Sequence, residues 1–133
     1  MGRHGENLDN LIDASKAAME NAYAPYSNFK VGAAVLGASG RVYSGCNVEN
    51  VSYGLSLCAE RTAIFKAVSE GEREIRAIAI SSSSGKAAFP CGACRQVMAE
   101  FAPSGEDMHV YLVSDEGVET YTLADLLPHA FRL

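Results

Sequence analysis

The sequence lacks a long apolar run: no stretch of about 18 consecutive hydrophobic residues would predict a transmembrane helix. The opening residues, 1–6, also lack the apolar core of a secretory signal, so we expect a cytoplasmic protein. Basic residues are too few to favour binding of a nucleic-acid polymer, because 11 Lys and Arg stand against 16 Asp and Glu. The composition therefore argues against membrane and nucleic-acid partners and indicates a globular chain.

Cysteine is also scarce, with only four residues in the chain. Because thiols stay reduced in the cytoplasm, these residues are expected to be metal ligands or buried thiols and not disulfides. They are Cys46, Cys58, Cys91 and Cys94.

Hydrophobic periodicity and turn residues predict one α/β domain over residues 1–133, with no internal repeat and no linker. Ser15 lies on the apolar stripe of the first helix and is small enough to be tolerated there, and Pro25 is expected to break that helix. The expected elements are a helix over 7–22, strands over 29–36 and 41–46, a helix over 58–70, a strand over 75–80, a helix over 91–101, strands over 108–113 and 118–122, and a short helical segment over 123–127. Five strands interleaved with helices imply a three-layer α/β/α sandwich, with one sheet covered on both faces.

Three of the cysteines form a pattern typical of a metal site. Cys91 and Cys94 are separated by two residues at one predicted helix start, and Cys58 lies at another. The pair alone is compatible with a zinc clamp, a redox motif or coincidence, but the third cysteine favours zinc. Three thiolates leave one coordination position for a water molecule, as in catalytic zinc sites. Cys46 is expected to be a small buried residue, although as a fourth ligand it would make the chain a structural zinc module.

Charged residues accompany these cysteines. Glu60 follows Cys58 by two residues and can move protons beside a bound water, although a carboxylate in the first turn of a helix is also favoured by the helix dipole. Three thiolates around Zn²⁺ leave an excess negative charge, which Arg61 can offset by donating hydrogen bonds to sulfur. Arg95 has the same possible role, but a solvated helix face is the preferred interpretation for it.

Four motifs carry a resemblance to a known family. The sequence resembles the homotetrameric cytidine deaminases, within the wider cytidine and deoxycytidylate deaminase superfamily, over residues 15–131. The motifs occur in the order and spacing of that family, and they are FKVGAA at 29–34, GCNVEN at 45–50, CAERT at 58–62 and PCGACRQ at 90–96.

The resemblance implies a mixed five-stranded sheet and the zinc-dependent hydrolysis of cytidine and 2′-deoxycytidine to uridine and 2′-deoxyuridine, with release of ammonia, in pyrimidine salvage. It implies one Zn²⁺ per chain on Cys58, Cys91 and Cys94, with Glu60 as the catalytic proton shuttle. It also implies a homotetramer with shared active sites. The residues implied to contact substrate are Asn47 and Glu49 at the ribose, Phe29 beside the sugar and base, backbone near Ala59 and Pro90 at the pyrimidine edge, and Tyr53 and Phe131 in the pocket of a neighbouring subunit.

Three alternatives compete with the interpretation as a cytidine deaminase. A deaminase for another small substrate, such as blasticidin S or a modified cytidine, would keep the zinc motif, but the NVEN stretch at 47–50 favours plain nucleosides. A polynucleotide deaminase is disfavoured by charge and by the lack of an aromatic and basic stripe. A non-catalytic zinc module would require Cys46 as a ligand and would leave Glu60 without a role.

Overall fold

The computed structural model describes residues 2–133, with side chains from residue 8 onward. Met1 and the side chains of residues 2–7, which include the opening segment considered above, lie outside the described residues. The elements follow in the order α1 (Gly2–Met19), β1 (Val31–Gly37), β2 (Val42–Cys46), the 3₁₀ helix η1 (Tyr53–Leu55), α2 (Ala59–Ser69), β3 (Ile75–Ser82), α3 (Gly92–Glu100), β4 (His109–Ser114), β5 (Gly117–Thr122) and α4 (Leu123–Leu126).

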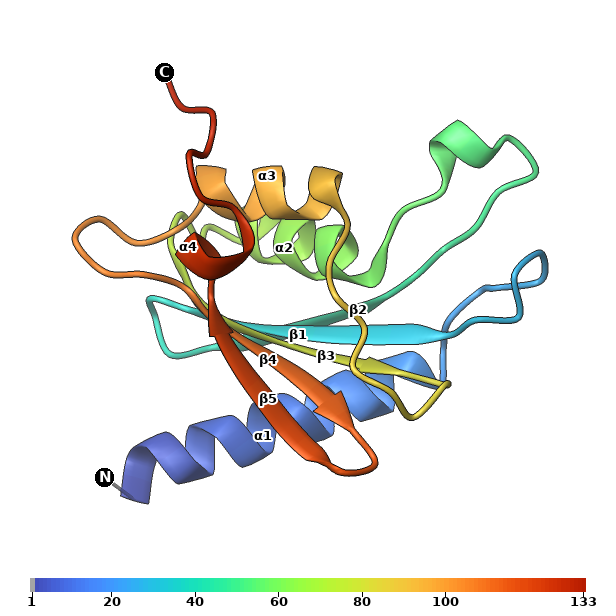
Figure 1. The fold of residues 1–133 in the computed structure, drawn as a ribbon, viewed down its shortest axis with the longest axis horizontal. Helices are drawn as coiled ribbons and strands as arrows, with labels where there is room; N and C mark the ends of the chain where they lie inside the picture. The colour runs from blue at the N-terminus through green and yellow to red at the C-terminus, as the bar shows by residue number, and fades with distance from the viewer. Residues whose placement is uncertain (1) are drawn as a thin grey trace.

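The five strands form one mixed sheet in the order β2-β1-β3-β4-β5. Strand β1 pairs antiparallel with β2 and β3, β3 pairs parallel with β4, and β4 pairs antiparallel with β5. Helix α1 lies on one face of the sheet, and α2, α3 and α4 lie on the other (Figure 1). This arrangement confirms the predicted three-layer α/β/α class. Within the described residues, no helix is both long and apolar enough to cross a membrane.

Two apolar clusters fill the spaces on either side of the sheet. The larger one joins the sheet to α2 and α3 and includes the fully buried Ile64, Ile78, Met98 and Leu112. The smaller one lies under α1 and centres on Leu11 with alanines of β1 and β3. Alternate residues of β4 point into the larger cluster, as a half-covered strand requires.

Glycines set the distance between the helices and the sheet at two positions. A Cβ atom on Gly32 of β1 would collide with the backbone of α1 at the carbonyl oxygen of Ser15. A Cβ atom on Gly45 of β2 would lie 2.6 Å from the backbone nitrogen of Ala63 in α2. Helix backbones therefore rest directly on the sheet at these two points, and Gly45 determines how closely α2 approaches it.

The first helix ends earlier than predicted. It stops at Met19, whereas the sequence predicted residues 7–22. The next residues bond to a distant segment: the Tyr23 amide donates to the Asn47 carbonyl at 3.0 Å, and the Glu49 amide donates to the Tyr23 carbonyl at 2.9 Å. These contacts straighten the chain before Pro25 is reached, so the proline does not determine where the helix ends.

The first helix begins at Gly2, five residues before the predicted start, and the remaining boundaries lie within two residues of prediction. Strand β3 continues to Ser82 because Ser81 and Ser82 pair with the start of β1. Ser15 is fully buried on the helical stripe, where its hydroxyl oxygen lies 2.7 Å from that of Ser81. The segment between β2 and α2 was expected to be irregular, but it contains the 3₁₀ helix η1.

Candidate active site

The three predicted cysteine ligands meet at the N-terminal ends of two helices. Cys58 is the residue before the first turn of α2, Cys91 is the residue before the first turn of α3, and Cys94 lies within that turn. Their sulfur atoms all lie within 4.8 Å of one another, with 3.8 Å between Cys58 and Cys91 and 3.4 Å between Cys91 and Cys94. Tetrahedral zinc with bonds of about 2.3 Å needs sulfurs about 3.8 Å apart, so the three thiols fit this ion.

The surroundings of the three sulfurs favour negative charge. The sulfurs lie at the N-terminal ends of two helices, where the helix dipole favours negative charge, and Nη2 of Arg61 lies 3.5 Å from the Cys58 sulfur. Hydrogen bonding from the Cys94 thiol, followed by that from Arg61, lowers the pKa of Cys58 to about 5. The Nε atom of Arg61 is buried and has no hydrogen-bond partner among the described residues.

Cys46 lies apart from this group. It is half-buried at the end of β2, and the described part of the chain holds only the three other cysteines within ligand distance of one another. The cluster therefore keeps the open coordination position that the spacing predicted, and the alternative of a closed four-cysteine site has no support in the geometry.

Glu60 lies in the first turn of α2, two residues after Cys58, and only 5% of its surface is exposed. Burial raises the pKa of Glu60 to about 7, and the nearby Cys58 thiolate adds to the shift. A carboxyl group with a pKa near neutrality can both accept and donate a proton under ordinary conditions. Glu60 therefore has the position and the acidity of a general acid-base residue.

A small pocket of about 190 Å³ opens beside the cysteines. The predicted residues that it brings together are Phe29, Asn47, Ala59 and Glu60, next to Cys58 and Cys91. Phe89 also lines the pocket, and its ring centroid lies 5.3 Å from that of Tyr121. Sequence reasoning missed Phe89, although an aromatic residue directly before the PCGACRQ motif was an available signal. The full lining is Phe29, Val31, Asn47, Cys58, Ala59, Glu60, Ile80, Ala88, Phe89 and Cys91.

Asn47 is buried, and its amide is held by backbone at the entry to β1. Its Nδ2 donates to the Phe29 carbonyl at 2.8 Å, and its Oδ1 accepts from the Val31 amide at 2.9 Å. One N–H of the amide is then still available to the pocket. The side chain thus fixes the strand start and presents a rigid donor to the cavity.

Glu49 and Tyr53 do not line the pocket with the cysteines. They line a neighbouring cavity of about 390 Å³ together with Tyr26, Ser27 and Ser56. The Glu49 carboxylate accepts hydrogen bonds from the Tyr26 amide at 3.0 Å and from the amide and hydroxyl of Ser27. The Ser27 hydroxyl is the main cause of its lowered pKa, so Glu49 is held in the charged form.

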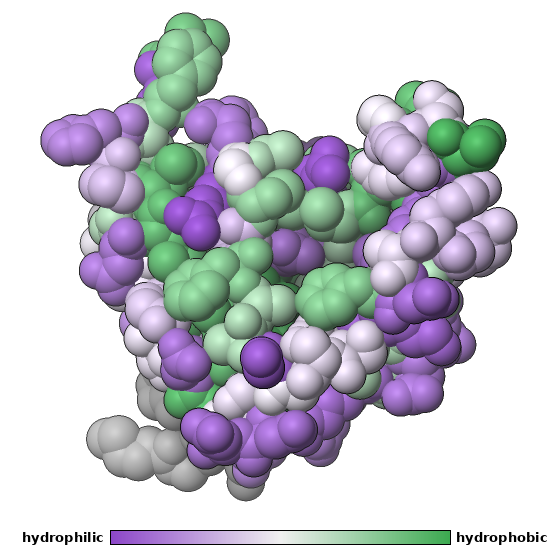
Figure 2. Space-filling model, turned by 45° about the vertical axis from the view of Figure 1, so that its right-hand side comes forward, coloured by the Kyte–Doolittle hydropathy of each residue, from purple (hydrophilic) through white to green (hydrophobic). Residues whose placement is uncertain are grey.

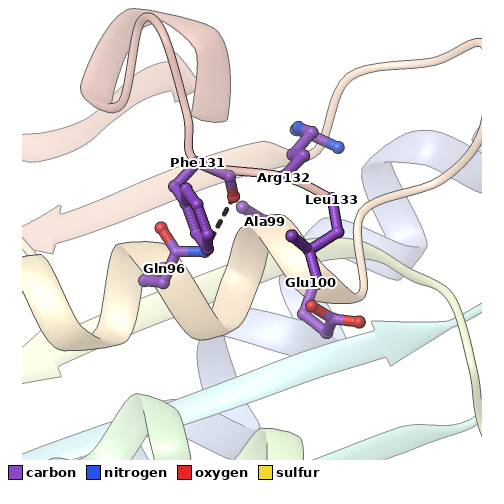
Figure 3. Close-up of a pocket in the computed structure, with 6 residues that line it drawn as sticks. All are labelled: Gln96, Ala99, Glu100, Phe131, Arg132 and Leu133. Carbon is purple, nitrogen blue, oxygen red and sulfur yellow. Dashed lines mark hydrogen bonds between the residues drawn. The ribbon is translucent and has the colours of Figure 1, made fainter.

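Phe131 does not line the pocket beside the cysteines of its own chain and lies against α3 instead. The chain end passes over this helix, where Phe131, Arg132 and Leu133 face Gln96, Ala99 and Glu100 across a pocket of about 330 Å³ (Figure 3). Gln96 Nε2 donates to the Phe131 carbonyl at 3.0 Å, and 71% of the Phe131 surface is exposed. The ring is therefore not folded back on its own core.

Arg95 takes neither of the two roles considered from sequence. The Nε atom donates to the Pro90 carbonyl at 2.7 Å, and Nη1 donates to the Leu126 carbonyl at 2.6 Å. The guanidinium thus contacts backbone on two sides, instead of the sulfurs or a solvated helix face. The preferred interpretation of Arg95 as a solvated residue is wrong, because two distant carbonyls converge on it.

Comparison with known proteins agrees with this geometry. Residues 6–108 match the family described as "Cytidine and deoxycytidylate deaminase zinc-binding region". The chain is 51% identical over 126 residues to the cytidine deaminase of Sporosarcina psychrophila, covering 94% of this chain and 91% of that protein. It is 47% identical over 121 residues to the cytidine deaminase of Mycobacterium tuberculosis H37Rv, covering 91% of this chain and 86% of that protein.

Solved structures show the same similarity. The crystal structure of cytidine deaminase from Burkholderia pseudomallei matches with a TM-score of 0.85 and 51% identity, covering 92% of this chain and 98% of that one. The fold and the three-thiol site define a zinc-dependent hydrolase of the deaminase class. Within that class, the chain belongs to the cytidine deaminase family.

Proposed function

We propose that this protein hydrolyses cytidine and 2′-deoxycytidine to uridine and 2′-deoxyuridine with release of ammonia, a reaction of pyrimidine salvage. The observation that carries the proposal is the placement of a buried carboxyl group, Glu60, beside three converging thiols in a pocket. Family membership supplies the substrate class. The zinc site needs three reduced cysteines, and this supports a cytoplasmic location because that compartment keeps thiols reduced.

The chain's contribution to the metal is a rigid set of three thiolates. Cys58, Cys91 and Cys94 hold one Zn²⁺, and helix N-termini together with Arg61 offset the negative charge of the sulfurs. When bound, Zn²⁺ acts as a Lewis acid that lowers the pKa of a water molecule, so that the water can serve as a nucleophile near neutral pH. Two of the ligands precede helices and the third lies in a first turn, so the site is built on rigid elements.

Glu60 moves the protons of the reaction. As a carboxylate it takes a proton from the attacking water and delivers it to N3 of the pyrimidine, while the water oxygen bonds to C4. Glu60 then takes the proton of the hydroxyl group now on C4 and gives it to the amino group. The bond between C4 and nitrogen breaks, the oxygen stays on C4 as a carbonyl, and ammonia leaves. A pKa near 7 suits a group that must gain and lose a proton in each cycle.

The substrate contacts follow from the pocket lining. The Phe29 ring packs beside the sugar and base, and the free N–H of Asn47 donates to a ribose hydroxyl. The amide of Ala59 belongs to the first turn of α2 and is available, with the Pro90 region, to the pyrimidine edge. Glu49 lies outside this pocket, in the cavity that Ser27 also lines, and its proposed role is to accept a hydrogen bond from a ribose hydroxyl.

We further propose a homotetramer in which neighbouring subunits complete each site. The 3₁₀ segment and the chain end project on opposite sides of the helical face, and Figure 2 shows apolar side chains gathered between the two projections. Val51, Tyr53, Leu55 and Phe131 are all at least 69% exposed in the single chain. Large apolar side chains exposed together on such projections are typical of an interface, and they support the assignment of Tyr53 and Phe131 to a neighbouring pocket.

A substrate panel tests the function. Purified zinc-loaded protein is given cytidine, 2′-deoxycytidine, cytosine, CMP and adenosine, and both the ultraviolet change and the released ammonia are measured. We expect turnover of the two nucleosides with one ammonia per product. Cytosine lacks the sugar and CMP places a phosphate near the charged Glu49, so both are expected to be poor substrates. Efficient turnover of CMP, or inactivity on both nucleosides, would count against the proposal.

A further inference from the structure

We propose, on the basis of the zinc site described above, that Arg95 is a positioning residue. It holds the turn that carries Cys91 in the shape that zinc binding needs, and it fastens the C-terminal segment to the same turn. The guanidinium contacts no sulfur, so it acts through backbone geometry and not through the charge of the thiolates.

The Cys91 turn is the part of the site with the least packing support. Cys94 is fully buried in the core and Cys58 is half-buried, but Cys91 is exposed. The segment before it, 83–90, forms no regular helix or strand. A thiol in this position needs some other constraint to keep its direction toward the metal.

The side chain of Arg95 fixes the first of two consecutive carbonyls in this turn, and the ordinary backbone bond at the start of α3 fixes the second. Its Nε donates to the Pro90 carbonyl at 2.7 Å, and its own backbone N–H donates to the Cys91 carbonyl at 3.0 Å. The peptide planes before and after Cys91 are thus both fixed, and the direction of the bond from Cα to Cβ follows from them. The fully buried ring of Pro90 holds the turn from the other side.

The same guanidinium reaches the C-terminal segment. Nη1 donates at 2.6 Å to the carbonyl of Leu126, the last residue of the short helix α4. Carbonyls at a helix end lack intrahelical partners, and a cation there also suits the helix dipole. Gln96 bonds separately to the Phe131 carbonyl (Figure 3), so the chain end has a second attachment that does not involve the Cys91 turn.

Zinc release to an excess of chelating dye tests the proposal without any measurement of deamination. R95M should release zinc about tenfold to a hundredfold faster than the wild type, because loss of groups that orient metal ligands typically weakens binding by this factor. Q96A should free only the chain end and leave zinc release unchanged. R73M is a matched control, since Arg73 Nη1 also donates to two backbone carbonyls, of Val68 and Glu72.

The melting temperature of each metal-free variant separates positioning from general stability. Faster release in R95M, with R73M equal to the wild type, supports the proposal. An unchanged rate in R95M, or equal acceleration in R73M, overturns it. If R95M fails to fold, R95K is used in its place. Lysine keeps the positive charge but lacks the planar guanidinium that donates to both the Pro90 and Leu126 carbonyls, so faster zinc release is again expected. If the wild type does not deaminate either nucleoside but R95M still releases zinc faster than R73M, the proposed function is contradicted and the role of Arg95 is not.

Discussion

At the scale of single residues, Glu60 shows how position determines chemistry. In the first turn of a helix a carboxylate is ordinarily stabilised in its charged form. Here burial outweighs that effect and raises the pKa to about 7. The same residue type at position 49 accepts three hydrogen bonds and has a lowered pKa. The two carboxyl groups therefore suit the different roles proposed for them, proton transfer for Glu60 and the accepting of hydrogen bonds as an anion for Glu49.

The raised pKa of Glu60 predicts a pH-dependent stability in the metal-free protein. The folded state holds the proton more tightly than the unfolded state, so this contribution is present below pH 4.5 and is lost as pH rises toward 7. The unfolding free energy of the wild type, relative to E60Q, should fall by about 3 kcal/mol between about pH 4 and pH 8. Urea unfolding of both proteins measures this difference, and both retain Cys58. A constant difference would show that the carboxyl group is not desolvated.

Asn47 predicts a variant with two separate defects. N47A removes the partners of the Phe29 carbonyl and the Val31 amide, so unfolding free energy should fall by about 1 to 3 kcal/mol. It should also raise KM for cytidine while zinc content is kept. N50A removes an exposed loop contact to the Ser52 amide and should change stability by less than about 0.5 kcal/mol. Equal KM values for N47A and the wild type would exclude Asn47 from the ribose contact.

At the scale of elements, the site depends on how two helices rest on the sheet. Helix α2 carries Cys58 and Glu60, and α3 carries the other two thiols. The backbone of α2 lies against Gly45, on the same face of the sheet as the site, whereas α1 lies against Gly32 on the opposite face. The close approach of α2 to β2 therefore sets the positions of Cys58 and Glu60 relative to the sheet.

The two glycines provide a matched pair of substitutions. G45A and G32A should each lower the unfolding free energy by about 1 to 3 kcal/mol or more, because each new Cβ meets helix backbone that cannot easily move. Only G45A should also weaken zinc binding, measured by competition with a chelator, because it displaces α2. Equal loss of zinc affinity in both variants would mean that overall stability, and not the position of α2, controls the site.

Local patterns were sufficient to predict most elements and the zinc ligands. The spacing of Cys91 and Cys94 and the apolar alternation of the strands are encoded within a few residues. Helix α4 was predicted in place, and its start is fixed locally by reciprocal hydrogen bonds between Thr122 and Asp125. The position of the Cys58 sulfur beside the other two could be expected only from the combined pattern, and the structure confirms that it lies there.

Features that depend on distant contacts could not be read from sequence. The early end of α1 follows from bonds between Tyr23 and the segment after β2. The role of Arg95 depends on the Leu126 carbonyl, which only the folded chain brings to it. Glu49 lies two residues after Asn47 in the sequence but lines a different cavity, where the amides of Tyr26 and Ser27 and the Ser27 hydroxyl hold its carboxylate.

At the scale of the whole molecule, the single chain leaves its pocket partly open. The 3₁₀ segment and the C-terminal segment project beyond the helical layer (Figure 1). Their apolar side chains gain nothing from exposure to water, and burial against another subunit would recover that free energy. An assembly in which these projections cover neighbouring pockets accounts for both features.

Assembly and activity should therefore be linked. Sedimentation of the wild type should give about four chain masses, and F131A should raise KM for cytidine while keeping its zinc. Aromatic stacking on a base could add roughly 0.5 to 1.5 kcal/mol beyond area burial. L133A changes another exposed apolar residue of the chain end and serves as the control. A monomer with full activity would contradict the shared-site proposal.

Glu60 is proposed to move protons beside a three-thiolate zinc site, and the E60Q variant removes that ability. The variant keeps the size and burial of the side chain but cannot take a proton from water. With zinc content and cytidine turnover measured on the same preparation, we expect one zinc per chain and a turnover lower by at least about 10² to 10⁴. Turnover close to that of the wild type, in a variant that has kept its zinc, would exclude Glu60 as the residue that transfers protons.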